Sequence, residues 1–189
     1  MKYLSLFILL LLLPVLAAAN KSKLDPDPEL RERLISAIND ADSFEDRFEA
    51  EVWLLDMSTR LQKKVPDSIE RLELLRLIHR EANRAKLTPE LVLAVIDIES
   101  RFDRFAISSV GAQGLMQVMP FWLKEIGHPD DNLVDTHTNL RLGCTILRFY
   151  LDKEKGDLRN ALRRYNGEVT KRVYADKVLD ALFKRWYKA

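Results

Sequence analysis

Apolar residues recur at helical spacing along almost the whole chain, and this constrains the fold more than any other feature of the sequence. From Glu29 onward, most of them fall three or four positions apart, which is the spacing of one face of an α-helix. No stretch shows the sustained alternation of apolar and polar residues that a half-buried strand requires. The sequence therefore predicts a compact all-α domain.

Most of the predicted helices have recognisable start signals. Asp, Ser and Thr cap helix N-termini, and proline is favoured in the first helical position. Predicted starts lie at Asp67 or Ser68, at Thr88 with Pro89, at Asp135 or Thr136, and at Asp157. Gly156 and Gly167 are predicted stops. Residues 114–127 are predicted to form a further short helix, with Pro120 near its middle or at a break, and residues 171–188 a closing helix.

The first 19 residues have the layout of a secretory signal peptide. Lys2 precedes an apolar run from Leu4 to Leu16, and the small residues Ala17 and Ala19 follow it. The run is shorter than the ~20 apolar residues that a membrane-spanning helix needs. We expect cleavage after Ala19, release into the periplasm and no integral membrane segment in the mature chain. The alternative is an uncleaved N-terminal membrane anchor.

Four segments follow from these patterns. Residues 1–19 are the predicted signal peptide, and the polar stretch 20–28, with two prolines, is a flexible leader. Residues 29–66 carry two amphipathic stripes and form a predicted N-terminal helical extension, for which the sequence suggests no chemistry. Residues 67–189 form the predicted main domain.

Charge and cysteine content narrow the function classes. The chain has 30 basic and 29 acidic residues, and removal of Lys2 with the signal leaves a formally neutral mature chain. This argues against a nucleic-acid partner, because such proteins usually show a basic excess. Cys144 is the only cysteine and lies in an apolar helical pattern, so it is expected to be a buried, inert thiol. One cysteine and three histidines offer little for a zinc site.

A carboxylate stands at the end of the most apolar segment, "LVLAVIDIES". Between Leu91 and Ile98 only Asp97 is polar, and a helix that is apolar on nearly all sides is buried. Glu99 would then emerge at the C-terminal end of a core helix, where desolvation and the helix dipole both raise its pKa. A carboxyl group that stays protonated near neutral pH suits a general acid. The alternative is that Glu99 simply faces water.

A glycine-containing stretch, "SSVGAQGLMQ", follows this acid. Gly111 and Gly114 allow the backbone to approach a ligand closely. Ser108 and Gln117 offer neutral donors and acceptors suited to sugar hydroxyl and acetamido groups, and Met116 offers an adaptable apolar contact. The alternative is an ordinary turn that leads into a helix.

These motifs together resemble the soluble lytic transglycosylase (SLT) domain, a relative of goose-type lysozyme. The family pattern is Glu-Ser, then Ala-x-Ser, then Gly-Ala-x-Gly-Leu-Met-Gln, and later Tyr-Asn. The matching positions are Glu99-Ser100, Ala106 to Ser108, Gly111 to Gln117, and Tyr165-Asn166, with Asn139 and Gly143 on the intervening helix. Two departures stand out: Arg104 occupies a position that is often proline, and the loop after Asn166 is leaner than usual.

The resemblance implies a lysozyme-like helical fold and cleavage of peptidoglycan glycan strands, with no metal or organic cofactor. Glu99 would be the catalytic acid. Ser108 and Gln117 would contact the glycan, and Met116 would line the floor of the cleft. Tyr165 would hydrogen-bond Glu99 or the substrate's acetamido group, unless it is only a half-buried aromatic residue. Asn166 would orient the loop or bind sugar, unless it only ends a helix.

The chemistry implied by the resemblance needs one carboxylate. The β-1,4 bond between N-acetylmuramic acid and N-acetylglucosamine would be cut with formation of a 1,6-anhydro sugar. Two-carboxylate hydrolysis of the same bond is the first alternative, with Asp97 or Asp103 as the second acid, although neither belongs to the family motif. A non-catalytic murein-binding or scaffold protein is the second alternative. Retention of Glu99, Gln117 and Tyr165 together argues against it.

Overall fold

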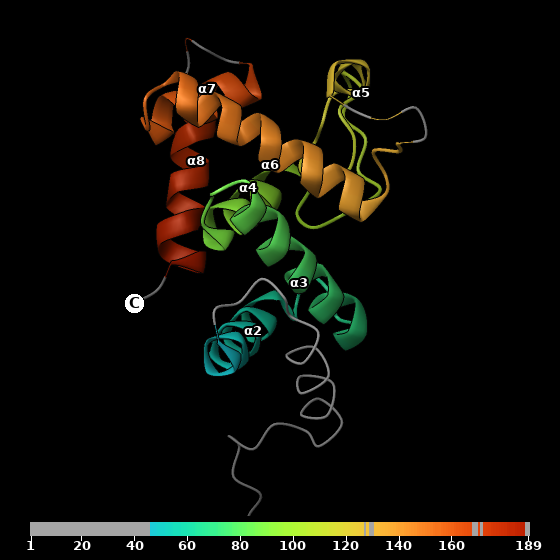
Figure 1. Ribbon diagram of the computed structural model, residues 1–189, viewed down its shortest axis with the longest axis vertical. Coiled ribbons are helices and arrows are strands. Elements are labelled where there is room, and N and C mark those ends of the chain that lie inside the picture. The colour runs from blue at the N-terminus through green and yellow to red at the C-terminus, as the bar shows by residue number, and fades with distance from the viewer. Residues whose placement is uncertain (1–45, 127, 129–130, 168–169, 171, 188–189) are drawn as a thin grey trace, which may run out of the picture.

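The computed structural model describes residues 46–126, 128, 131–167, 170 and 172–187. The described residues form helices joined by turns and loops, with no named strand among them, which confirms the predicted all-α class. Figure 1 shows how the helices are arranged. Their bounds are α2 Arg47–Leu61, α3 Ser68–Arg84, α4 Pro89–Glu99, α5 Phe121–Ile126, α6 Thr136–Lys153, α7 Leu158–Asn166 and α8 Val173–Ala181, followed by a π-helical turn, η1, Leu182–Trp186.

The short helix α4 lies at the centre of the fold and carries the candidate acid at its end. All residues from Leu91 to Asp97 are buried, as the apolar sequence predicts. α3 packs against α4 on one side, and α8 with η1 packs against it on another (Figure 1). α6 contacts both α3 and α7, while α2 packs against α3. The C-terminal end of α4 is therefore surrounded by segments that are distant in the sequence.

Aspartate side chains cap most of the helices where the sequence predicts a start. Asp67 accepts hydrogen bonds from the first-turn amides of α3, Asp135 from the amide of Thr138, and Asp157 from the amide of Asn160. α4 is an exception: Thr88 makes no side-chain cap, and Pro89 alone marks the start. Gly167 follows α7 with a φ of +79°, the left-handed conformation of a helix stop.

The prediction of a helix across residues 114–127 is wrong in its first half. α5 begins only at Phe121, immediately after Pro120. Before it, Gly114 and Gln117 adopt positive φ angles of +75° and +50°, which a right-handed helix excludes. Isolated β-bridges join Gln113 to Ile107 and to Val118, so the segment folds back on itself as a tight loop.

Several predictions concern the N-terminal region. The predicted signal peptide 1–19, the leader 20–28 and the first amphipathic stripe of the extension lie outside the described residues. The second stripe corresponds to α2. Among the helices that the structure describes, none combines the length and apolar character needed to cross a bilayer.

Candidate active site

Glu99 is the last residue of α4, and its carboxyl group is in a strongly desolvating environment. Burial raises the pKa of this carboxyl group from its usual 4.5 to about 7. A hydrogen bond from the Tyr174 hydroxyl, at 2.6 Å from Glu99 Oε1, acts in the opposite direction and lowers the pKa. Glu99 can therefore hold a proton near neutral pH and can also release it.

Two tyrosines from the C-terminal helices lie near this carboxyl group. Tyr174, in the first turn of α8, donates directly to Glu99. Tyr165, near the end of α7, donates its hydroxyl to the backbone carbonyl of Met116 at 2.7 Å. Burial raises the pKa of both phenols well above 10, and the nearby charge of Glu99 raises both further. Both tyrosines are therefore neutral hydrogen-bond donors at physiological pH.

The chain turns sharply after Glu99. Arg101 and Phe102 have positive φ angles of +55° and +73°, a conformation that is uncommon for residues other than glycine. Ser100 is buried; its hydroxyl oxygen accepts from the Phe102 amide at 3.2 Å and lies 3.3 Å from the Ile96 carbonyl to which it donates. Ser100 thus stabilises the turn.

The loop 111–118 is fastened to α6 by one buried amide side chain, that of Asn139. Asn139 Oδ1 accepts from the Met116 amide at 2.8 Å, while Nδ2 donates to the Gln113 and Leu133 carbonyls, each at 2.8 Å. Gly114 is required beneath it, because a Cβ there would lie 2.3 Å from Asn139 Nδ2 and 2.5 Å from the Leu133 carbonyl oxygen. Gly114 thus permits the close approach of loop and helix.

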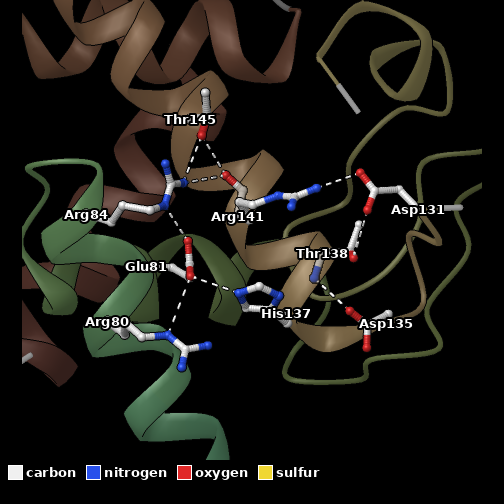
Figure 2. Close-up of polar contacts among 9 residues, drawn as sticks. All are labelled: Arg80, Glu81, Arg84, Asp131, Asp135, His137, Thr138, Arg141 and Thr145. Atoms are coloured by element: carbon white, nitrogen blue, oxygen red, sulfur yellow. Dashed lines mark hydrogen bonds and ion pairs between the residues drawn. The ribbon is translucent and has the colours of Figure 1, made fainter. Parts of the chain in front are cut away.

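The start of α6 is itself held by polar contacts around one buried carboxylate, that of Glu81 (Figure 2). The Glu81 side chain, buried on α3, accepts from Arg84 Nε at 2.6 Å and lies 3.2 Å from His137 Nε2 on α6. Arg84 also donates to the Arg141 carbonyl and to Thr145 Oγ1, each at 2.9 Å. The helix that carries Asn139 is therefore tied to α3, which in turn supports α4.

Comparison with known proteins identifies the family. The family model described as "Transglycosylase SLT domain" matches residues 76–178, more than half of the 189 residues. The chain belongs to the transglycosylase SLT domain family. The matched range contains Glu99, the loop 111–118, Asn139 and both tyrosines, so it covers the whole site described above.

Individual relatives share only part of their length with this SLT-domain chain. A "Transglycosylase" of Enterobacteria phage PRD1 is 41% identical over 81 residues, which is 43% of this chain and 29% of the phage protein. A "Membrane-bound lytic murein transglycosylase C" of Actinobacillus pleuropneumoniae serotype 5b (strain L20) is 41% identical over 46 residues, 24% of this chain and 13% of that protein. The chain thus spans less than a third of each relative.

Two solved structures of lytic transglycosylases are similar at lower identity. An inactive mutant of the lytic transglycosylase Slt from Pseudomonas aeruginosa gives a TM-score of 0.47 with 20% identity, covering 85% of this chain and 34% of that one. The 70 kDa soluble lytic transglycosylase from Escherichia coli also gives 0.47, with 17% identity, covering 79% of this chain and 29% of that one.

Hydrogen bonds of the loop connect four of the six predicted site residues, namely Ser108, Met116, Gln117 and Tyr165. Gln117 Nε2 donates to the carbonyls of Ala106 and Gly114, each at 3.1 Å, so this side chain also braces the loop. Ser108 Oγ accepts from the Ala112 amide at 3.0 Å at the other end of the same loop. Both side chains remain partly exposed, which leaves them surface for a ligand.

Met116 differs from its predicted position on the floor of a cleft. Its side chain is fully buried and has no surface to offer a glycan. Gly143 makes this possible: a Cβ at that position would lie 2.5 Å from Met116 Sδ. Cys144 lies beside it, with the two sulfur atoms 3.9 Å apart, and is a buried thiol as predicted. The Met116 side chain therefore locks the loop onto α6, and its carbonyl positions Tyr165.

Tyr165 and Asn166 also differ from one another in their placement. Tyr165 is half-buried and reaches the loop rather than Glu99 itself, according to its hydrogen bond with Met116. Asn166 is exposed at the last position of α7, before the left-handed Gly167. The structure therefore gives Asn166 the position of a helix end, which the sequence had offered as the alternative.

Sequence reasoning missed Tyr174, the residue that contacts the acid. The signal was present but weak: Tyr174, Ala175, Val178 and Ala181 form the buried side of α8, and only the tyrosine among them carries a polar group. A buried tyrosine hydroxyl needs a hydrogen-bond partner. The sequence did not indicate which partner, since Glu99 lies 75 residues away.

The two other carboxylates near Glu99 in the sequence are already engaged. Asp97 is 4% exposed and is contacted by Lys64, Arg185 and Trp186. Asp103 accepts from the amide of Phe105 at 2.9 Å, as part of the turn after α4.

Proposed function

We propose that this protein is a peptidoglycan lytic transglycosylase that uses Glu99 as its only catalytic carboxyl group. The proposal rests on one observation above all: a desolvated glutamic acid with a pKa of about 7, in hydrogen-bond contact with a neutral tyrosine, at the Glu-Ser position of an SLT domain. A pKa near the ambient pH is the value that favours a group which must both give and take a proton.

In the first step, protonated Glu99 donates its proton to the oxygen that links N-acetylmuramic acid to N-acetylglucosamine. The bond between C1 of the muramic acid and this oxygen breaks, and the N-acetylglucosamine unit leaves as an alcohol. The acetamido group of the muramic acid stabilises the positive charge that develops at C1. Tyr174 holds the Glu99 carboxyl group in place and stabilises the carboxylate that this step produces.

In the second step, ionised Glu99 accepts the proton of the 6-hydroxyl group of the same muramic acid, and that oxygen bonds to C1. The product is a 1,6-anhydro sugar, and Glu99 returns to its protonated state. No water is consumed. The nucleophile is tethered to the reacting centre, which lowers the entropy cost of the step, so a second protein carboxylate is not needed.

The remaining predicted residues serve binding and loop geometry in this proposal. Ser108 and Gln117 present partly exposed polar groups to the glycan while they brace the loop. Tyr165 and the buried Met116 fix the loop relative to Glu99. Asn166, which follows Tyr165 in the sequence, lies at the surface and contacts the glycan in this proposal. The glycan strands of peptidoglycan are the proposed substrate, with export to the periplasm by residues 1–19.

Mass spectrometry of muropeptides released from purified murein tests the proposal directly. We expect products with anhydro ends, each lighter by one water than the hydrolysed equivalent. Hydrated reducing ends would instead identify a muramidase on the same fold. Murein binding without any released product would identify a binding protein.

A further inference from the structure

We infer that Lys64 and Trp186, which both lie outside the matched SLT domain, position the catalytic turn by gripping it on both sides of Glu99. This inference rests on the proposed function, because it concerns the rate of the reaction proposed for Glu99. The grip consists of a closed set of contacts among four side chains: Lys64, Asp97, Phe102 and Trp186.

The first side of the grip is Asp97, two residues before Glu99 on α4. Its Oδ1 accepts from Lys64 Nζ at 2.6 Å. Its Oδ2 accepts from Trp186 Nε1 at 3.2 Å and lies 3.0 Å from Arg185 Nε. Asp97 is almost fully buried, so these three partners replace the water that a carboxylate would otherwise bind.

The second side of the grip is Phe102, three residues after Glu99. Its ring packs on that of Trp186 with centroids 5.6 Å apart, and Lys64 Nζ lies 5.8 Å from its centroid. Lys64 and Trp186 thus each contact both Asp97 and Phe102. A change at either one disturbs both flanks of Glu99 at once.

The turn after Glu99 depends on contacts from other parts of the chain. Arg101 and Phe102 hold positive φ angles, a strained conformation for residues with side chains. Such a conformation persists only where the surroundings over-determine it. Since the carboxyl group of Glu99 must meet a glycosidic oxygen, a misplacement of about 1 Å can cost about 10²-fold in rate.

The grip also gives a role to residues on both sides of the matched range 76–178. Lys64 follows α2 in the N-terminal extension, and Trp186 ends η1 near the C-terminus. Arg60 Nη1 on α2 donates to the Arg185 carbonyl at 2.9 Å, which fastens the extension to the C-terminal segment. The matched domain, residues 76–178, contains Asp97 and Phe102 but neither of the groups that hold them.

The test compares the full-chain variants Lys64→Met, Lys64→Arg and Trp186→Phe. Lys64→Met keeps an unbranched stem but removes the charge, and Trp186→Phe keeps an aromatic ring but removes the N–H donor. Rates are measured on purified murein, at a temperature where circular dichroism shows every variant fully folded. We expect kcat to fall about 10-fold in Lys64→Met with KM unchanged, a smaller fall in Trp186→Phe, and recovery of most of kcat in Lys64→Arg.

Lys184→Met is the matched control, because it removes an exposed lysine that pairs with Asp180 on the same C-terminal segment. It should retain the wild-type kcat. A Lys64→Met protein that is less stable but keeps the wild-type kcat per folded molecule would overturn the inference, since its role would then be structural only.

The wild-type protein shows whether a negative result comes from the proposed function or from the inference about Lys64 and Trp186. If wild type releases no product from murein, that proposal fails, and the grip is then measured by hydrogen exchange. In that case the amides of residues 100–103 should exchange at least 10-fold faster in Lys64→Met than in Lys184→Met, and equal exchange would refute the grip.

Discussion

Replacement of Tyr174 by phenylalanine should shift the pH dependence of the reaction toward alkaline pH. The Tyr174 hydroxyl donates to Glu99 Oε1 at 2.6 Å, and this bond lowers the pKa of a carboxyl group that burial has raised to about 7. A donated hydrogen bond stabilises the ionised form. Its loss removes the lowering effect and leaves burial unopposed, so the pKa of Glu99 must rise.

The size of the shift follows from the strength of that bond. A hydrogen bond to a charged group contributes about 1.5–3 kcal/mol. Because about 1.4 kcal/mol corresponds to one pKa unit, the Tyr174→Phe substitution should raise the pKa of Glu99 by about 1–2. The alkaline limb of kcat/KM, where the free enzyme loses its acid, should move upward by the same amount.

The assay is the pH profile of kcat/KM on purified murein for wild type, Tyr174→Phe and Tyr150→Phe. Tyr150, on α6, takes no part in this hydrogen bond, so Tyr150→Phe should keep the wild-type limb. The rate at the optimum should fall in Tyr174→Phe, because the carboxyl group loses its orientation and its carboxylate is less stable. An alkaline limb that stays in place, or moves to lower pH, would refute this account of the site.

Three further outcomes are expected. Glu99→Gln should abolish cleavage while murein binding persists. Because the pKa of Glu99 is about 7 in the folded protein and 4.5 when unfolded, the wild-type protein should lose roughly 3 kcal/mol of unfolding free energy as the pH rises from 4.5 to 7. The variant should keep this free energy, and denaturant titration at both pH values measures the difference. Asp97→Asn and Asp103→Asn should still form anhydro product, whereas removal of a true catalytic base lowers the rate about 10²–10⁴-fold. A rate loss of that size in folded Asp103→Asn, together with hydrated product from the wild-type protein, would indicate a two-acid muramidase. N-terminal sequencing of the exported protein should begin at Asn20, and an intact Met1 in the membrane fraction would favour an anchor.

Local sequence signals predicted most of the helix ends and the buried surroundings of Glu99. Capping aspartates and glycine stops act within a few residues, so Asp67, Asp135, Asp157 and Gly167 could be read without knowledge of the fold. The burial of α4 followed from its uninterrupted apolar residues. The raised pKa of Glu99 then followed from its place at the end of a buried helix.

Features that depend on distant partners could not be predicted in the same way. The hydrogen bond from Tyr174 spans 75 residues, and those from Lys64 and Trp186 to Asp97 span 33 and 89. The predicted position of Met116 was wrong for the same reason: its side chain enters the core only because Gly143, on α6, leaves space for it. The start of α5 was misjudged because positive φ at Gln117 comes from the loop's own bridges and not from a residue preference.

The surroundings of Glu99 favour a reaction in which one group serves as acid and then as base. Burial alone would keep the carboxyl group protonated and make the second step slow, whereas an exposed carboxylate would fail in the first. The opposed effects of burial and of Tyr174 leave the pKa at about 7, where neither step is strongly disfavoured. Asp97 is held by two cations and an indole N–H, so it would have to abandon these partners to activate a water. Asp103 is exposed on the turn after α4, where one of its oxygens accepts from a backbone amide. A nucleophile that arrives as part of the substrate avoids that reorganisation.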